Sequence, residues 1–407
     1  MATSLIRRFP RVTVALHPGS CGLRFSNDDH RRSFSGDATT VTVSIEEAQS
    51  TTARALEKIG WDASDAALQA EIMTAAELCG NNQGLVKMYQ PKLMAPSPDA
   101  GKPTIERETA SSAVVNAHQA PGMLAAVTAA DLAMSKCTPI SIVSSYNTST
   151  SSGQLAFYVE RMARKGYVGL AMANSPEFVA PASGAKPRFG TNPLAVGLPR
   201  SSGPPFTVRR ESWKVIIMED HQTAVNPGDY VSVSAGSTHS HRCSQFDMAT
   251  SAIALFGLLT SKAQGTPLPE QVAYDKEGKW TTDAASVLEG GAIATFGGHK
   301  GAGLALCVEL LAGALSGGAV LGQVESKKVA KSWGHTFICI DPKAMVDDYE
   351  TKVDSILGTL SSDGVRIPGE RSARTAEERK AAGTLPIPIK IWESIVHTAE
   401  HGLPDEK

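Results

Sequence analysis

A His299-Lys300 pair stands between glycines in the stretch TFGGHKGAGLAL, residues 295–306, directly before a long apolar run. Glycines let a ligand approach the backbone closely, the first N–H groups of a helix have no partners within it, and a lysine adds positive charge. Together these features are typical of an anion-binding site at a helix N-terminus. A glycine-rich helix entry without a ligand explains the same residues, so both interpretations stay open.

A second polar stretch follows the apolar segment at residues 168–174, where Asn174 and Ser175 begin a loop. The loop is rich in proline and glycine and returns to an apolar segment at 194–198. Such a loop brings small polar side chains and exposed backbone into a cleft, as a specific pocket for a polar ligand requires. The sequence therefore predicts that this loop lines a ligand pocket.

Several other kinds of site are absent from the sequence. No G-x-G-x-x-G follows a predicted strand, and neither a Walker loop nor a G-x-S-x-G elbow occurs. A net charge of −2 without a long basic block argues against nucleic acid, and six cysteines without a CxxC pair argue against a disulfide framework or a thiolate zinc site. The apolar run at 302–322 is interrupted by Glu309 and predicts a packed core helix rather than a membrane span.

The elements that must position these motifs follow an α/β pattern. Two helices open the folded part, at 44–60 from a Ser44 cap and at 64–80 from a Ser64 cap, and each ends at a glycine. Strands and helices then alternate in the order 112–117 (strand), 121–136 (helix), 140–145 (strand), 153–165 (helix) and 168–174 (strand). Such alternation is typical of an α/β layer architecture.

Beyond residue 200 the alternation is interrupted by a polar span at 200–245. A helix at 247–262 is expected next, with Asp247 as its N-cap. The remaining expected elements are a helix at 282–289, a strand at 336–341 and helices at 343–361 and 388–401.

The N-terminal residues 1–27 contain four arginines and no Asp or Glu. This composition is typical of a transit peptide, and RRSFS at 31–35 has the form of a matrix-processing site, which predicts a mature start near Ser35 and a mitochondrial matrix location. A disordered basic tail is the alternative.

Four separate stretches resemble, in order and spacing, the type 2 malate/L-lactate dehydrogenases, NAD(P)-dependent enzymes whose family also contains ureidoglycolate, diketogulonate and piperideine-carboxylate reductases. The stretches lie at 169–199, 247–251, 288–317 and 365–388, within a resemblance over residues 45–405. The resemblance implies a homodimer and an α/β fold unrelated to the Rossmann fold, with a mixed sheet and flanking helices. It implies that NAD or NADP is held by two loops, with contacts from Asn174, Ser175, Gly190, Thr191, Asn192 and Pro193 in one and Gly298, His299, Lys300 and Gly301 in the other.

The resemblance also predicts a division into domains. After the transit peptide at 1–34, residues 35–120 form the N-terminal helical part of a dimerisation and substrate domain. Residues 121–300 form the NAD(P)-binding domain, and 301–407 complete the first domain. Residues 209–245 are expected to be an insertion, because relatives run almost directly past this point, and extra strands there suggest a partner-binding surface.

The chain differs from the family in the stretches that carry the family's catalytic residues. Relatives carry Asp-Ser-His-Gly-x-x-Arg, in which the His transfers the substrate proton and the Arg holds the substrate carboxylate. In ELCGNNQGLVKM, Gln83 stands at the His and Lys87 at the Arg, and a second family His corresponds to Ser151. An amide cannot act as a general acid near neutral pH, whereas Lys87 can still attract a carboxylate as a point charge. Asp247 matches the family's acidic residue near the substrate, and its expected role as N-cap explains it equally well.

Other residues carry weaker hypotheses. His118 is a candidate substitute acid or an ordinary loop histidine. His239, His241 and Cys243 alternate in THSHRC and are a candidate metal site or a solvent-exposed loop; we expect no metal.

Two functions therefore compete. One is hydride transfer to or from a small 2-oxo or 2-hydroxy acid or a cyclic imine, with activity weakened or altered by the lost His and Arg. The other is a catalytically silent homologue that serves as a structural subunit of a mitochondrial assembly.

Overall fold

The structure is a computed structural model that describes residues 40–81, 83–201, 231–232, 243–321, 323, 332–365, 367 and 369–403. The predicted transit peptide at 1–34 lies outside these residues. So do His239, His241 and most of the predicted insertion at 209–245. The hypotheses on these segments stay predictions.

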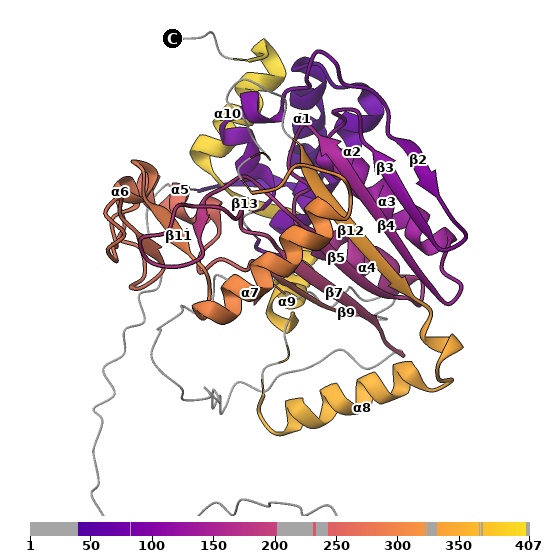
Figure 1. The fold of residues 1–407 in the computed structure, drawn as a ribbon. Helices are drawn as coiled ribbons and strands as arrows, with labels where there is room; N and C mark the ends of the chain where they lie inside the picture. Colours follow the sequence, from indigo (N-terminus) through magenta and orange to yellow (C-terminus); the bar gives the residue numbers. More distant parts are fainter. Residues whose placement is uncertain are drawn as a thin grey trace, which may run out of the picture. The chain divides into compact units, whose positions relative to one another are not determined.

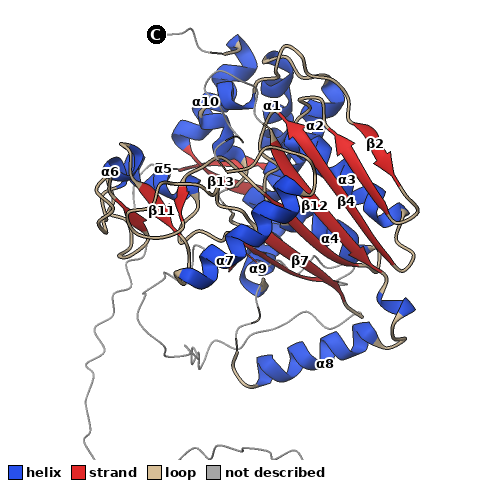
Figure 2. Ribbon diagram, in the orientation of Figure 1, coloured by secondary structure: helices blue, strands red, loops and turns tan. Residues whose placement is uncertain are grey.

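A mixed eight-stranded sheet organises the described residues (Figure 2). Its strands lie in the order β2 (Thr104–Glu108), β3 (Ser112–Asn116), β4 (Ile140–Thr148), β12 (Trp333–Ile340), β5 (Val168–Ala173), β7 (Leu194–Pro199), β9 (Cys243–Met248) and β8 (Val231–Ser232). β3 and β4 run parallel, and every other neighbouring pair is antiparallel. The predicted mixed sheet is confirmed, with β12 from late in the chain lying between β4 and β5.

Helical segments cover both faces of this sheet (Figure 1). They are α3 (Gly122–Ser135), α4 (Ala156–Arg164), α7 (His299–Val308) and the π-helical turn η3 (Glu309–Ala314) that continues α7. Neighbouring residues of a strand point to opposite faces, and β12 shows both environments. Phe337 packs edge-on against Tyr158 of α4, with ring centroids 5.8 Å apart, whereas the Thr336 hydroxyl donates to the Leu311 carbonyl of η3 at 2.6 Å.

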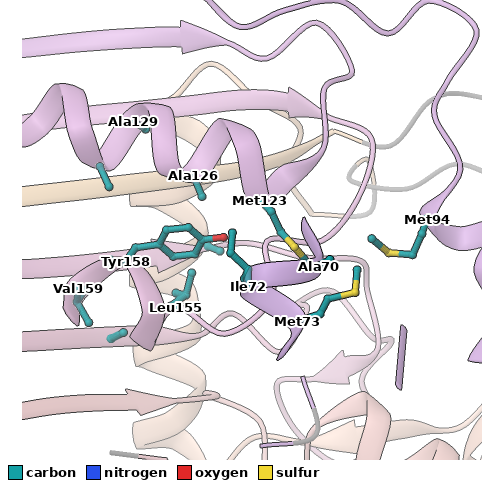
Figure 3. Close-up of a cluster of buried hydrophobic side chains, with 14 of the residues drawn as sticks. Ala70, Ile72, Met73, Met94, Met123, Ala126, Ala129, Leu155, Tyr158 and Val159 are labelled. Atoms are coloured by element: carbon teal, nitrogen blue, oxygen red, sulfur yellow. The ribbon is translucent and has the colours of Figure 1, made fainter. Parts of the chain in front are cut away.

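The main apolar core lies where α3 and α4 meet the N-terminal helices (Figure 3). Ile72, Met123 and Tyr158 are fully buried in it. The Tyr158 hydroxyl donates to the Ser152 carbonyl at 2.5 Å, which satisfies a polar group that would otherwise be costly to bury. The same hydrogen bond fixes the segment that carries Ser151.

The N-terminal and C-terminal ends of the described chain pack together. The elements are α1 (Ile45–Lys58), α2 (Ala63–Leu78), the 3₁₀ turns η1 (Leu85–Tyr89) and η2 (Pro91–Met94), α9 (Glu370–Ala382) and α10 (Ile389–His401). The strands β1 (Thr40–Ser44) and β13 (Thr384–Pro388) pair antiparallel in a two-stranded sheet. The main core contains side chains from each of the three predicted parts, residues 35–120, 121–300 and 301–407. The domain boundaries at 120 and 300 stay a prediction.

Of the N-caps predicted for the first two helices, that of α1 is confirmed and that of α2 is wrong. The Ser44 hydroxyl accepts from the Glu47 N–H at 3.1 Å, as expected for α1. For α2 the prediction of Ser64 is wrong, because Asp62 has the extended cap backbone and accepts from the Asp65 N–H at 2.9 Å. Ser64 already lies inside the helix and donates to the Asp62 carboxylate.

A smaller group of elements has its own apolar core, which includes Leu258, Val272 and Ile293. Its elements are β6 (Val179–Ala180), β10 (Ala273–Tyr274), β11 (Ala292–Ala294), α5 (Leu255–Gln264) and α6 (Ala284–Leu288). The predicted start of α5 at Asp247 is wrong. Asp247 pairs with Ala195 in the β9–β7 ladder, and the chain leaves the sheet before the helix begins at Leu255.

The C-terminal third differs most from prediction. The predicted helix at 343–361 is a 3₁₀ turn, η4 (Pro342–Ala344), followed by α8 (Tyr349–Ser362). Helix α9 was not predicted, because only two of its alanines, Ala373 and Ala376, are buried and no large apolar side chain marks a buried face. Among the described helices, none combines the length and apolarity needed to cross a membrane.

The Ser44 cap makes a testable contribution to stability. Ser44→Ala removes the acceptor of the Glu47 N–H, so we expect the free energy of unfolding to fall by about 1 kcal/mol. Urea unfolding followed by circular dichroism measures it. Ser50→Ala is the control, since its exposed hydroxyl only donates within α1, and its effect should stay within about 0.5 kcal/mol. Equal effects of the two variants would contradict the assigned cap.

Candidate active site

Asn174 lies at the end of β5 with its amide fully engaged by the protein. Its Oδ1 accepts from the Gly334 N–H at 2.7 Å, and its Nδ2 donates to the Ala319 carbonyl at 2.8 Å. The side chain is fully buried. Asn174 therefore ties β5 to the start of β12 and to the segment after η3, while its neighbour Ser175 continues into the predicted loop.

The two ends of the predicted loop lie side by side. The Ser175 hydroxyl accepts from the Thr191 N–H at 3.0 Å. A Cβ on Gly190 would lie 2.0 Å from the Ser175 Oγ, so only glycine allows this approach. The Pro193 carbonyl accepts from the Ala173 N–H at 3.2 Å, which returns the chain to the sheet.

Asn192 has a strained backbone, and within the described part of the chain only the nitrogen of its side-chain amide is hydrogen-bonded. Its φ is +38°, a region that asparagine tolerates better than most residues, and its side chain is fully buried. The Nδ2 donates to the Ala305 carbonyl at 3.1 Å and to the Glu309 Oε2 at 2.8 Å. Among the described residues, no donor reaches its Oδ1. Buried acceptors without a partner are rare in native proteins, and an ordered water or a bound ligand commonly supplies the donor.

The glycine-flanked entry of α7 lies against this loop. The Thr250 N–H donates to the Thr191 carbonyl at 2.8 Å, and the Thr250 carbonyl accepts from the Phe296 N–H at 3.1 Å. Thr250 therefore joins the two stretches that sequence analysis predicted to hold one ligand, although about a hundred residues separate them in the chain.

The first turn of α7 is open. No side chain of the described residues caps it, Gly298 has a φ of 59°, and both His299 and Lys300 are exposed. A Cβ on Gly301 would lie 1.9 Å from the Phe296 carbonyl O, so this glycine is required for the turn itself. Free N–H groups and a nearby lysine are the features of an anion site.

Gln83 and Ser151 lie on two segments that contact each other. The Asn81 Nδ2 donates to the Gln154 Oε1 at 3.2 Å. A Cβ on Gly153 would lie 4.0 Å from the Gln83 carbonyl O. Gln83 and Ser151, which the resemblance places at the positions of two family histidines, are thus close in the fold, and both residues are partly buried.

Lys87 is buried in η1, with its Nζ 4.4 Å from the centroid of the Phe256 ring. Burial lowers the pKa of Lys87 to about 7, because the low-dielectric interior disfavours the ammonium form. Among the described residues, no acidic side chain forms an ion pair with it. A buried cation in this state favours an anionic ligand.

Asp247 caps a helix, although not the predicted one. Its Oδ2 accepts from the Ala156 N–H at 2.9 Å, the first residue of α4, and it is nine-tenths buried. Burial raises the pKa of Asp247 to about 6, opposed by the N–H groups of Ala156 and Leu155. The cap role and the role near a substrate both remain consistent with this position.

His118 is hydrogen-bonded through its ring and its backbone N–H to residues of β2 and β3 and not to these groups. Its Nε2 is 2.7 Å from the Thr104 Oγ1 of β2, and its N–H donates to Asn116. The part of the chain that the structure describes holds no group of three or more His, Cys, Asp or Glu placed for a metal ion.

Two carboxylates beside the site were not predicted. Glu309 of η3 accepts from both Asn192 and the Leu321 N–H, the latter at 2.9 Å. Glu77 of α2 accepts from the Leu85 N–H of η1 at 3.1 Å, and burial raises its pKa to about 7. Each acid interrupts an apolar stretch of sequence, and that interruption was the available signal.

The chain matches the malate/L-lactate dehydrogenase family over residues 43–208 and 231–396. It therefore belongs to this family of NAD(P)-dependent oxidoreductases, which act on small hydroxy or oxo acids or cyclic imine carboxylates. The match leaves out residues 209–230, a shorter stretch than the predicted insertion.

Similar proteins agree with this assignment. An L-sulfolactate dehydrogenase of Methanothermobacter thermautotrophicus is 33% identical over 308 residues, which cover 74% of this chain and 78% of that protein. A malate/(S)-sulfolactate dehydrogenase of Methanothermus fervidus is 28% identical over 88% of this chain and 97% of its own. The solved structure of Δ1-piperideine-2-carboxylate reductase from Pseudomonas syringae pvar. tomato covers 88% of this chain and 100% of that one, with 26% identity and a TM-score of 0.71. The predicted non-Rossmann fold is confirmed.

The residues present fit a dinucleotide. The uncapped α7 N-terminus and exposed Lys300 suit a phosphate, and the unpartnered Oδ1 of Asn192 suits a donor on the ligand. These two features lie on the segments that the Thr250 backbone joins.

Two glycines of α7 provide a matched test of this turn. Gly301→Ala places a methyl group against the Phe296 carbonyl, so we expect the free energy of unfolding to fall by about 1–3 kcal/mol. Gly303→Ala meets open space, and helix propensity should raise stability by up to about 1 kcal/mol. Urea unfolding of both variants measures the contrast, and a stable Gly301→Ala protein would show that the turn is wrongly placed.

The lowered pKa of Lys87 predicts a pH dependence of stability. The pKa of Lys87 is about 7 in the fold and about 10.4 in the unfolded chain, so between these values only the unfolded chain holds the proton. Its contribution to stability therefore rises with pH across this range. Relative to Lys87→Met, the wild-type protein should gain stability between about pH 7 and about pH 9 in urea unfolding. A constant difference would mean that the buried amine keeps its charge.

Proposed function

We propose that this protein is an NAD(P)-dependent oxidoreductase of small carboxylates, with either a 2-oxo or 2-hydroxy acid or a cyclic imine as substrate. The observation that carries the proposal is the Thr250 backbone bridge, which sets the open N-terminus of α7 against the loop of Thr191 and Asn192. The bound coenzyme would supply or accept the hydride. Lys300 and the α7 N–H groups would hold its phosphates, and Asn192 would accept from one of its donors.

Lys87 is the proposed binding group for the substrate carboxylate. It stands at the position of the family's arginine, it is buried, and no acid among the described residues pairs with it. A lysine attracts a carboxylate without the two-pronged geometry of arginine, so it orients the substrate less strictly. Its attraction also depends on pH, because the amine must be protonated to act.

The substrate class follows from the missing proton donor. Gln83 and Ser151 offer no proton of suitable pKa, so an alkoxide formed from a ketone would need water or the Asp247 carboxyl. A cyclic imine can be protonated in solution before it binds. The site therefore favours an imine carboxylate over a ketone, and we expect weak turnover of 2-oxo acids.

A homodimer is part of the proposal, because the resemblance implies one. Support comes from the outer side of α7 and η3, where Leu306, Leu310 and Leu315 are exposed. A contiguous apolar face of this kind on a folded domain is typical of an interface. The acid-free N-terminus supports import into the mitochondrial matrix.

A second candidate function follows from the same differences between this chain and the family pattern. Replacement of both family histidines and of the arginine would leave a protein that binds coenzyme without turnover, as a structural subunit of a mitochondrial assembly. Size measurement of the native complex separates the two functions, because a free dimer favours the enzyme.

Coenzyme binding is the first test. Titration of NADH and of NADPH, followed by nicotinamide fluorescence, should saturate for at least one of them. Lys300→Ala should weaken that binding about tenfold through loss of a charge-assisted contact, whereas the exposed Lys276→Ala should not change it. Failure of both coenzymes to bind at millimolar concentration would refute the proposal.

Restoring the family residues is the second test. Gln83→His with Lys87→Arg supplies an acid and a bidentate carboxylate binder, and a positioned acid alone is worth about 10²–10⁴-fold in rate. The double variant should reduce pyruvate or glyoxylate faster than wild type by about that factor, measured as NAD(P)H absorbance. Ordinary enzymatic turnover of 2-oxo acids by the wild type would contradict the inferred loss of the proton donor.

A further inference from the structure

The buried carboxylate of Glu309 lies among donors from separate segments. Its Oε2 accepts from the Asn192 Nδ2 at 2.8 Å. Its Oε1 accepts from the Leu321 N–H at 2.9 Å and lies 3.4 Å from the Asn174 Nδ2. The residue is 2% exposed, so solvent does not share these bonds. One carboxylate thus joins the end of β5, the Gly190–Pro193 loop and the segment after η3.

The backbone around Glu309 is shaped for this contact. Glu309 begins the π-helical turn η3, in which the Leu315 N–H donates to the Leu310 carbonyl, five residues back. Such turns are rare and occur frequently at functional sites. A Cβ on Gly313 of this turn would lie 2.7 Å from the Asn174 Nδ2, so the amide reaches the turn only because position 313 lacks a side chain.

These contacts determine which atom of Asn192 is available. Both acceptors near its amide nitrogen, the Ala305 carbonyl and the Glu309 Oε2, require the nitrogen to face inward. The Oδ1 is left buried and without a donor among the described residues. A glutamine at position 309 would replace one carboxylate oxygen with an N–H₂ group. That group would face either the Asn192 Nδ2 or the Leu321 N–H, and two donors would then point at each other. The amide of Asn192 could then no longer present its oxygen in the same way.

We propose that Glu309 is a positioning residue that fixes the amide of Asn192, so that its Oδ1 accepts a hydrogen bond from an N–H or O–H group of the coenzyme. This inference rests on the proposed function, since it concerns the same coenzyme site. It adds a residue that touches no ligand and acts through the orientation of another side chain.

The test is a coenzyme dissociation constant measured by fluorescence for wild type, Glu309→Gln, Asn192→Gly and the double variant. Glycine is chosen because it tolerates the positive φ at position 192. Each single variant should bind about tenfold more weakly, as expected when one buried hydrogen bond is lost. In the Asn192→Gly background, Glu309→Gln should have no further effect, because the atom it orients is already gone.

A matched control separates positioning from loss of fold. Thr398→Val removes a buried hydroxyl that donates to the Ser394 carbonyl in α10, and it should leave the dissociation constant unchanged. If Glu309→Gln does not fold, Glu309→Asp takes its place, because it keeps both oxygens and retracts them by one methylene.

The outcomes distinguish the two proposals. If wild type binds coenzyme and the position 309 variant binds equally well, the positioning role is wrong and the proposed function stands. Additive effects in the double variant also overturn it, since they would show that Glu309 acts independently of Asn192. If wild type binds neither NADH nor NADPH, the proposed function fails and this inference fails with it.

Discussion

The arrangement of the candidate site depends on two backbone hydrogen bonds of Thr250. They join the Thr191 carbonyl to the Phe296 N–H and thereby set two distant stretches of chain against each other. The same short segment, from the end of β9 to the start of α5, also places Asp247 under the N-terminus of α4 and Phe256 over Lys87. A slip of β9 by one residue would turn Asp247 to the other face of the sheet and break all three relations at once.

Burial acts in opposite directions on two ionisable groups, Asp247 of this segment and Lys87 of η1, which lies against it. It lowers the pKa of Lys87 to about 7 and raises the pKa of Asp247 to about 6, because a low-dielectric environment favours the neutral form of either group. Both groups are charged only in the narrow interval between these values. A carboxylate ligand beside Lys87 would raise the pKa of the amine and widen that interval, so substrate binding and protonation are coupled at this position.

Local sequence rules predicted what local interactions determine. The Ser44 cap and the alternation of strands and helices up to β5 follow from patterns within a few residues, and they are confirmed, whereas the confirmed mixed sheet was implied by the family resemblance. Asp247 shows the limit, because its cap is made across 91 residues to Ala156, and a cap rule sees only the next turn of chain. Glu309 shows another limit. A charged residue in an apolar helix signals a buried partner, but the sequence does not say that the partners are two asparagines from other segments.

The segments of Gln83 and Ser151 pack closely against the rest of the fold. A Cβ on Gly84 would lie 2.3 Å from the Met73 carbonyl, and one on Gly122 would lie 2.2 Å from the Thr150 carbonyl, so the segments of Gln83 and Ser151 are held by contacts that only glycine permits. Glu77 fixes the first segment further through the Leu85 N–H. Close packing of this kind fixes the backbone positions of Gln83 and Ser151, and the proposed imine carboxylate suits such a site because a protonated imine needs no proton from the protein.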